Sequence, residues 1–453
     1  MTQPFKITGL SFKNYRQFQS CHLDFTDSQG QPLDKICFIG ANGTGKSTIL
    51  ELINQFLQQK TLRVDHDTNS LIAIRINTQS DESFFQLTNM GNNFIKSTAV
   101  ELPEWQKLWE RETNLTQLQD YRKRFRSYFV KSADIIDPLF QPNSQDLAIY
   151  APPDGSSLLL PNKPVPNTSL NTAMPYFEHF PAYHNIAYQN TTDFWTILIY
   201  HIKKRESDFQ QFLQQPATQS LSVAQARQQF DDQYPNILTD LAELWNFILE
   251  PAGLEFDIEN AKIPVQLGEN LEAYIRHITN KQTIPYNSLS SGIRNFIFRL
   301  GHIHSLYFNR DIQRGFLLID EPEASLFPDL LYDIIDRYQA ITQNTQLFVS
   351  THSPIIAAQF RPEERFVLNF NDEGYVTAHR GIVPEGDDPN DILLQDFAVR
   401  NLYGRKGLEQ WYRFLELKKE ILETDSPTKK QSLIAEYAEI GRAYNFAPDE
   451  IPQ

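Results

Sequence analysis

The sequence predicts an α/β fold, and three apolar runs that end in glycine or polar groups are the observations behind it. Residues 35–40, KICFIG, have the composition of a buried strand, and helical spacing follows in residues 47–59, STILELINQFLQQ. Residues 315–321, GFLLIDE, and residues 345–354, TQLFVSTHSP, are two further strand-like runs that end in acids or hydroxyls. We therefore expect several strands whose polar ends gather at one site.

The loop between the first strand and its helix has the sequence of a phosphate-binding loop. From Gly40 the chain reads GANGTGKS, which matches G-x-x-x-x-G-K-[ST] at every fixed position. Lys46 is expected to reach the β- and γ-phosphates, and Ser47 to ligate Mg²⁺. A glycine-rich turn that matches by chance is the structural alternative. The predicted nucleotide contacts in this loop are Gly40, Asn42, Gly43, Thr44, Gly45, Lys46, Ser47 and Thr48.

The ends of the other two strands supply candidates for hydrolysis. Asp320 fits the Mg²⁺ role, and Glu321 stands where a carboxylate can orient and deprotonate an attacking water. Ser350, Thr351 and His352 follow the third strand, and His352 is the candidate sensor of the γ-phosphate. The structural alternatives are a solvated acid at a strand end and a histidine that only packs. The pattern predicts ATP or GTP hydrolysis at this edge.

A further segment changes the expected mechanism. Residues 287–300, NSLSSGIRNFIFRL, combine a Ser-Ser-Gly turn with a helix. A helix cap with no further role is the structural alternative. The order of loop, LSSG, DE and His resembles that of ATP-binding-cassette ATPases. The resemblance implies a homodimer, or a higher homo-oligomer, with ATP sandwiched between subunits. It also implies that Ser290, Ser291 and Gly292 contact the γ-phosphate of the other subunit and that Glu321 is the catalytic base.

The residues around these motifs indicate a branch of that family. Transporter ATPases usually carry glutamine after the signature glycine, whereas this chain has Ile293, Arg294 and Asn295. PEASLFPDL, which follows the acids, looks like the DEPE-x-x-L-H-P pattern of the SMC/RecF-like and OLD-like branch, with Phe327 in place of the usual histidine. The resemblance therefore implies a P-loop NTPase of ABC/SMC-head type rather than a transporter subunit.

The amino-terminal residues strengthen the same resemblance. ITGLSFKNYRQFQSCHLDF, residues 7–25, is similar to the antiparallel opening strands of that branch, in which an arginine and aromatics approach the nucleotide. The resemblance implies that Arg16 contacts the nucleotide and that Tyr15 or Phe18 stacks on the adenine. A plain surface position on a strand is the alternative for each of them.

The chain divides into four predicted regions. Residues 1–100 and 281–382 are the two halves of the ATPase lobe, 101–280 a mostly helical insertion lobe, and 383–453 a helical extension. Within the insertion, helices are expected at 102–131, 194–215 and 238–253, the last closed by its glycine, and a long loop at 141–178. The aromatic and basic tract at 104–131 is the candidate contact for DNA or a partner, with a solvated helix face as the alternative.

The C-terminal tail carries a resemblance that indicates the biological role of the protein. Residues 408–422 and 432–444 have helical spacing. This tail, from residue 386, looks like the one that closes the ATPase of the Septu anti-phage system and its retron-associated relatives. The chain shows no HNH or TOPRIM constellation, so the resemblance implies a separate nuclease of one of those types as partner. The expected function is an ATP-hydrolysing sensor subunit of a defence complex. A RecF-like repair ATPase that clamps duplex DNA is the alternative.

Composition limits the remaining choices. No run approaches the eighteen apolar residues of a spanning helix, and the start lacks the features of a signal peptide, so we expect a cytoplasmic protein with no membrane partner. Cys21 and Cys37 are expected to be buried free thiols. The formal net charge of -15 disfavours nucleic-acid binding by the chain alone. The expected cofactors are ATP and Mg²⁺, and ATP is favoured over GTP by the family resemblance.

Overall fold

The computed structural model describes twelve stretches of the chain and divides it into two compact units. The units are Met1–Pro389 and Asn390–Gln453, and each is described by itself. The described stretches are residues 6–58, 71–77, 82–87, 93–97, 129–131, 145–153, 182–186, 191–257, 275–284, 288–324, 326–399 and 402–446.

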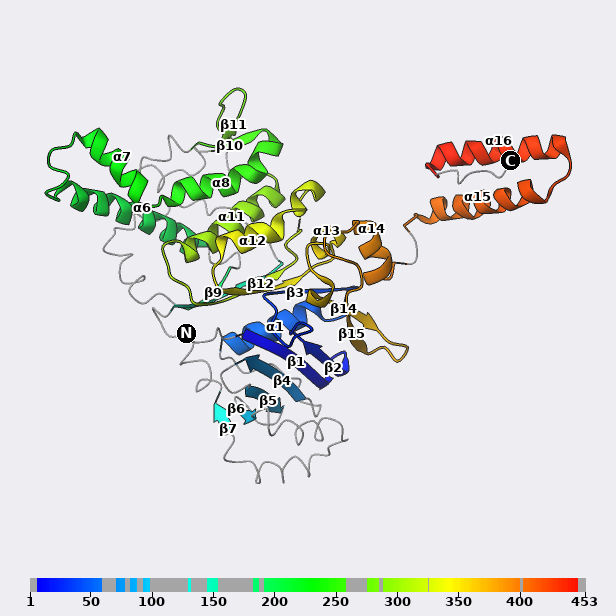
Figure 1. Ribbon diagram of the computed structural model, residues 1–453, viewed down its shortest axis with the longest axis horizontal. Coiled ribbons are helices and arrows are strands. Elements are labelled where there is room, and N and C mark those ends of the chain that lie inside the picture. The colour runs from blue at the N-terminus through cyan, green and yellow to red at the C-terminus, as the bar shows by residue number, and fades with distance from the viewer. Residues whose placement is uncertain are drawn as a thin grey trace. The chain divides into compact units, whose positions relative to one another are not determined.

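The first unit is organised around a mostly parallel sheet (Figure 1). Its strand order is β15-β14-β3-β13-β12-β8-β9, and only β15 runs antiparallel to its neighbour. The predicted α/β class is confirmed. The strands are β3 (Lys35–Gly40), β8 (Asp146–Ala151), β9 (Tyr183–Asn185), β12 (Arg314–Asp320), β13 (Thr345–Ser350), β14 (Arg365–Phe370) and β15 (Val376–Arg380).

Strand β8 corrects one expectation. It lies within residues 141–178, which the Pro-, Asn- and Ser-rich composition predicts to be a long loop, yet Asp146–Ala151 is a fully buried strand paired with β12. Arg314 of β12 binds the Asp146 carboxylate through Nε and Nη2 at 2.6 and 2.8 Å. The loop prediction is wrong here because this ion pair and the pairing with β12 stabilise a six-residue strand inside a segment of turn-forming composition.

A second, antiparallel sheet of order β2-β1-β4-β5-β6-β7 is built mainly from the amino-terminal residues, which confirms the predicted antiparallel strands there. The helix expected at 102–131 lies outside the described residues except at its end, where the structure has a strand instead. The strands are β1 (Lys6–Tyr15), β2 (Phe18–Asp24), β4 (Leu71–Asn77), β5 (Glu82–Leu87), β6 (Asn93–Ser97) and β7 (Phe129–Lys131).

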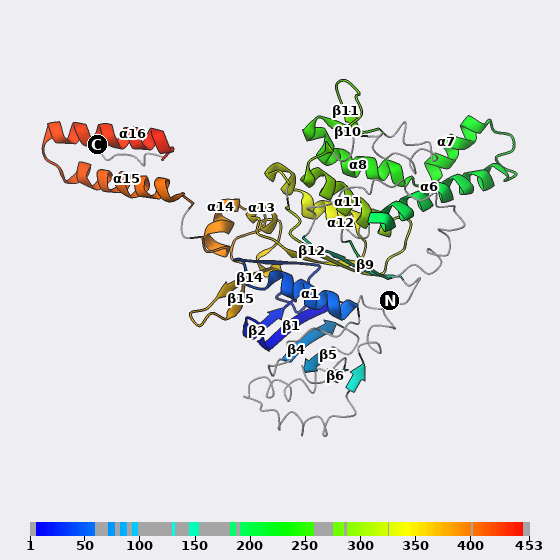
Figure 2. The same cartoon turned by 180° about the vertical axis from the view of Figure 1, so that it is seen from behind.

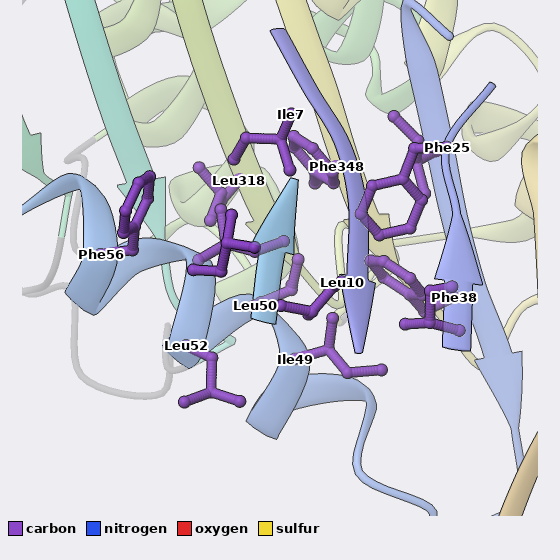
Figure 3. Close-up of a cluster of buried hydrophobic side chains, with 14 of the residues drawn as sticks. Ile7, Leu10, Phe25, Phe38, Ile49, Leu50, Leu52, Phe56, Leu318 and Phe348 are labelled. Carbon is purple, nitrogen blue, oxygen red and sulfur yellow. The ribbon is translucent and has the colours of Figure 1, made fainter. Parts of the chain in front are cut away.

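Helix α1 (Lys46–Leu57) and the antiparallel sheet share one hydrophobic core with the parallel sheet (Figure 3). Side chains alternate between the two faces of each parallel strand, so Phe316 and Leu318 join this core while Leu317 and Ile319 are buried on the opposite face. A parallel sheet buried on both faces needs such continuous apolar runs. This explains why the strands were visible in the sequence.

Helices cover the opposite face of the parallel sheet from α1 in both views (Figures 1 and 2). The indole of Trp245 donates to the carbonyl of Ile297 at 3.1 Å and joins two of these helices. The helices predicted at 194–215 and 238–253 are confirmed, and Gly253 ends the second with a φ of 73°. The helices are α6 (Thr191–Leu213), α7 (Val223–Gln233), α8 (Ile237–Leu249), α11 (Ser291–Tyr307) and α12 (Ile334–Ile341).

The second unit contains a helical hairpin of α15 (Arg405–Glu423) and α16 (Pro427–Tyr444), which confirms the two predicted tail helices. The guanidinium of Arg413 binds the Glu436 carboxylate at 2.9 and 3.2 Å and so links the two helices. The hairpin has a core of its own, made of Phe414, Leu417, Ile421, Leu433, Tyr437 and Phe446.

Cys21 and Cys37 are buried free cysteines, as predicted. Within the described stretches, none of the helices combines the length and the apolar character needed to cross a bilayer.

Two buried histidines predict a loss of stability in acid. Burial lowers the pKa of His201 to about 4 and that of His302 to about 3. Between these values and the ordinary 6.5, the unfolded chain binds protons that the folded chain does not, so stability falls as the pH falls through this window. Each histidine contributes a slope of about 1.4 kcal/mol per pH unit. Urea unfolding at a series of pH values measures it.

The control for this prediction compares the slope of the unfolding free energy against pH in different variants, rather than the unfolding free energy at one pH. His302→Gln should flatten the acid slope, whereas replacement of the exposed His379 by glutamine should leave it unchanged. An acid slope that is the same in wild type and His302→Gln would contradict the assignment of this histidine.

Candidate functional site

The carboxyl ends of three parallel strands bring the predicted motifs together. Strand β13 lies between β3 and β12, with Ser350 paired to Phe38 on one side and to Asp320 on the other. Because neighbouring parallel strands end at the same edge, the loop after β3, the turn after β12 and the residues after β13 meet there. The structure therefore places Lys46, Asp320 and His352, taken from three distant segments, in one neighbourhood.

The phosphate-binding loop needs its glycines for backbone conformation and space. Gly40, Gly43 and Gly45 have φ values of 143°, 82° and 95°, all in the region that favours glycine. A Cβ at Gly40 would collide with the carbonyl of Leu368 on β14, and one at Gly45 would lie 2.6 Å from the ring of Phe18. The loop is therefore closely enclosed by β14 and by the turn between β1 and β2.

Lys46 is held inside this loop. Its side chain is only 5% exposed, and Nζ donates to the carbonyls of Gly40 and Ala41 at 2.9 and 3.0 Å. Thr44 is also buried and donates to the carbonyl of Ala41 at 2.8 Å, whereas Asn42, Gly43 and Ser47 are exposed and Thr48 is half-buried. A nucleotide phosphate would replace the carbonyls as the acceptor for the ammonium group.

Three carboxylates follow β12 and face Lys46. Burial lowers the pKa of the lysine, and the charges of Asp320, Glu321 and Glu323 oppose that shift. Asp320 is 1% exposed; its Oδ1 accepts the hydroxyl of Ser350, and its Oδ2 is buried without a hydrogen-bond partner in the described part of the chain. A buried, unpaired carboxylate oxygen suits a cation that arrives with the nucleotide.

Glu321 has an unusual backbone conformation. Its φ is 48°, which is uncommon for a residue with a Cβ, and its N–H donates to the carbonyl of Ser350 at 2.9 Å. Such conformations persist only where the surroundings hold them, and they cluster at functional sites. The turn directs the Glu321 carboxylate toward His352, whose Nε2 lies 3.9 Å from Oε1.

The surroundings of His352 favour its neutral imidazole form. Partial burial lowers its pKa, and the charge of Lys46 lowers it further, against the opposing effects of Glu321 and Asp320. Its backbone N–H donates to Oε1 of Glu323 at 2.6 Å. A neutral imidazole has one N–H that can donate to a phosphate oxygen and one nitrogen that can accept a hydrogen bond from a water.

The turn between β1 and β2 reaches the phosphate-binding loop, and the aromatic residues on either side of the turn are buried. Arg16 has a φ of 48°, and its Nη1 lies 3.5 Å from the hydroxyl oxygen of Thr48. Gln17 donates to the carbonyl of Gly43 at 3.3 Å. Tyr15 is 2% exposed and Phe18 is fully buried in the core, so the prediction that one of them stacks on the adenine is wrong. Both rings instead belong to the hydrophobic core, and the Phe18 ring packs against Gly45 of the loop.

The Ser-Ser-Gly segment starts α11. Ser290 is the N-cap, and its hydroxyl accepts the N–H of Ile293 at 3.3 Å. Its side chain is exposed, Ser291 is the first helical residue, and Gly292 is buried. Arg294 donates to the carbonyl of Leu289 at 2.7 Å. The exposed cap leaves the hydroxyl of Ser290 accessible from outside.

The side chains of Arg299 and Glu323, whose contacts were not predicted from the sequence, connect the segments at this edge of the parallel sheet. Arg299 of α11 is 7% exposed, and it donates to the carbonyls of Pro152 at 2.8 Å and Glu321 at 3.4 Å. Glu323 holds the backbone of His352, as described above. The second glutamate of DEPE was visible in the sequence, but nothing there indicated its partner; Arg299 looked like any polar residue on a helix.

A phosphate-binding loop between a buried strand and a helix, with acids at the end of a neighbouring parallel strand, defines a P-loop NTPase. The comparison of sequences agrees. The chain belongs to the AAA_15 family, described as an AAA ATPase domain, whose model matches residues 6–357. The predicted ATPase branch is thereby confirmed, and the protein is a nucleotide-binding ATPase.

Relatives and solved structures were also found. The chain is 22% identical over 426 residues to a protein named Retron Vc95 probable ATPase, from Vibrio cholerae serotype O1 biovar El Tor, covering 86% of this chain and 78% of that protein. An SMC head from Thermotoga maritima matches with a TM-score of 0.41 and 11% identity, over 83% of this chain and all of its own. An Smc head from Pyrococcus furiosus, bound to the C-terminal domain of ScpA, matches with a TM-score of 0.41 and 13% identity, over 83% and 96%.

Proposed function

We propose that the protein is the ATP-switched regulatory subunit of an anti-phage defence complex whose nuclease is a separate polypeptide. The observation that carries the proposal is a second compact unit, a helical hairpin, after the ATPase unit. The relative named as a retron ATPase, which aligns with 86% of the chain, supports the same reading. So does the resemblance of the tail to that of Septu ATPases.

The hairpin carries an apolar stripe on its outer side. Tyr412, Leu415 and Leu422 of α15 are 64%, 42% and 55% exposed, and their spacing of three and seven residues places them on one helix face. The opposite face of α15 packs on α16 through Phe414 and Leu417. We propose this stripe, with the hairpin that displays it, as the docking surface for the nuclease, of HNH or TOPRIM type.

The proposed roles at the ATPase site follow from the geometry. Lys46 binds the β- and γ-phosphates, the loop N–H groups and Arg16 orient the nucleotide, and Glu321 accepts a proton from the attacking water. His352 donates to the γ-phosphate while its neighbour Glu321 holds the water. These assignments make hydrolysis depend on two residues that approach each other only because β12 and β13 are neighbours.

Magnesium fits the same residues. The buried Oδ2 of Asp320, which has no hydrogen-bond partner among the described residues, and the hydroxyl of the exposed Ser47 are oxygen ligands of the kind that this cation takes at such loops. When bound, Mg²⁺ neutralises charge that develops on the phosphates. Asp320 is oriented for this by the hydroxyl of Ser350, which occupies its other oxygen.

Association around ATP is the proposed form of the switch. Ser290 is exposed, as a residue that contacts a second subunit must be, and Ser291 and Gly292 continue into the helix. Phe327 and Tyr332, which follow the acids, are 66% and 52% exposed. We propose that two copies close on ATP with these residues at the interface.

The test is affinity purification of the tagged full-length protein from its own host, after nuclease treatment, with mass spectrometry of the bound proteins. Truncation after Val399 removes both hairpin helices but keeps Ile392 and Asp396, which are buried. A stoichiometric nuclease that is present with the full chain and absent with the truncated one is the expected result. No protein partner, together with ATP-dependent retention of duplex DNA before the treatment, would favour a RecF-like clamp instead.

A matched pair of variants separates docking from folding. The triple substitution of Tyr412, Leu415 and Leu422 by alanine should release the nuclease without unfolding the hairpin, because these side chains point away from its core. As the control, replacement of Val223 and Tyr234 by alanine should leave the nuclease bound. These residues are 68% and 42% exposed and belong to the other unit. Equal retention by both variants would exclude the stripe as the docking surface.

A further inference from the structure

Glu323 is the second acid after β12, and it joins the turn that contains Glu321 to the residues that follow β13. Its Oε1 accepts the backbone N–H of His352 at 2.6 Å, and the hydroxyl of Thr351 donates to the same carboxylate. Thr351 is fully buried and in turn accepts the N–H of Ser353 at 2.9 Å. The carboxylate therefore holds the short segment that carries the histidine.

The same two segments also meet at the start of the turn. At the start of the turn, the N–H of Glu321 donates to the carbonyl of Ser350 at 2.9 Å; at its end, the carboxylate of Glu323 accepts from His352. The turn and the residues after β13 are thus held at both ends. The distance of 3.9 Å between Nε2 of His352 and Oε1 of Glu321 depends on both contacts.

A carboxylate is an unfavourable choice for this position if its only task is packing. Oε2 of Glu323 is buried and has no hydrogen-bond partner among the described residues. Burial raises the pKa of Glu323, and the negative charge of Glu321 adds to that effect. A buried polar oxygen left unpaired carries a free-energy cost to folding. The cost indicates that the hydrogen bond to His352 matters for something other than stability.

We propose that Glu323 is a positioning residue for ATP hydrolysis, which fixes the backbone of His352 so that the imidazole and Glu321 face the γ-phosphate together. This inference rests on the roles proposed above for Glu321 and His352. Glu323 acts through His352, and it makes no contact with the nucleotide loop itself among the contacts given above. Its loss should slow the chemical step and leave ATP binding intact.

The experiment measures kcat and KM for ATP in three variants of the full chain. Glu323→Ala should lower kcat about 10- to 100-fold with KM nearly unchanged, because misplacement of a reacting group by about 1 Å can cost that much. Glu323→Asp keeps the charge but shortens the side chain by one methylene, so it should behave like alanine. Glu323→Gln keeps an acceptor oxygen at full length and should restore kcat to within about threefold of wild type.

A double-mutant cycle then separates this inference from the proposed function. In a His352→Ala background, Glu323→Ala should have almost no further effect, because the residue it positions is gone. Full additivity, an unchanged kcat in Glu323→Ala, or equal impairment of the alanine and glutamine variants would overturn the inference. If His352→Ala alone leaves kcat unchanged, the proposed role of His352 fails first. Urea unfolding of each variant confirms that the comparison is made between folded proteins.

Discussion

Replacement of Glu321 by glutamine should lower kcat by about 10²- to 10⁴-fold, the range for loss of a general base, while ATP still binds. Glutamine has nearly the same shape and keeps an oxygen near His352, but it cannot accept a proton from water. The backbone at this position, with a φ of 48°, should be unaffected because the N–H to Ser350 is retained. Single-turnover hydrolysis of labelled ATP, with bound nucleotide measured in parallel, separates the two effects.

The same variant should accumulate as an ATP-bound dimer, which light scattering detects as a doubled mass that requires ATP. Glu243→Gln, at an exposed acid on α8, is the control and should behave like wild type in both assays. A mass that does not depend on ATP in the Glu321 variant would count against association as the switch. A dimer in every nucleotide state would move the switch to closure within a preformed dimer.

Lys46→Ala should weaken nucleotide binding strongly, in addition to any effect on hydrolysis. In the structure the ammonium group is 5% exposed and bonded only to loop carbonyls of Gly40 and Ala41 in the contacts given above, so it is ready to transfer to phosphate oxygens. Loss of charge-assisted bonds of about 1.5–3 kcal/mol predicts a dissociation constant raised roughly 10- to 150-fold. Isothermal titration calorimetry with ATP measures it.

The control for Lys46 is Lys281→Ala, an exposed lysine that is bonded to Glu255 in the β10–β11 hairpin (Leu254–Phe256 and Ile275–His277). It removes the same charge without touching the site, so affinity should be unchanged. If both variants bind ATP equally well, the assignment of the loop lysine is wrong. If Lys46→Ala binds ATP normally but does not hydrolyse it, the lysine acts only in the chemical step.

The sequence predicted the strands and helices whose patterns are complete within a short window. Strands β3, β12 and β13 have continuous apolar runs because the sheet is buried on both faces, and Gly253 marked the end of the 3₁₀ turn that continues α8. Strand β8 was missed because its stability comes from β12 and the pair between Asp146 and Arg314, which lie far apart in the sequence. Pairings of this kind leave no local signal.

The candidate site, like the fold, was predicted where its sequence pattern lies within a short window. The loop and the acid pair were found from spacing alone, and the structure brings Lys46, Glu321 and His352 together. Burial was not predictable: Tyr15 and Phe18 looked like free aromatics beside a nucleotide, but they are core residues under the loop. An alternating strand pattern shows which residues share a face, not which layer that face packs against.

The order of the strands also determines when this protein acquires its activity during synthesis. The strand that leads into the phosphate-binding loop, β3, emerges early from the ribosome, yet both of its sheet neighbours, β13 and β14, are encoded far downstream at residues 345–350 and 365–370. Gly40 is enclosed by Leu368 of β14. A nascent chain or a prematurely terminated fragment therefore carries the sequence of the phosphate-binding loop but lacks the strands that enclose the loop in the folded protein. We expect such fragments not to bind ATP, so that only chains translated nearly to the end of the ATPase unit compete for nucleotide or for partners.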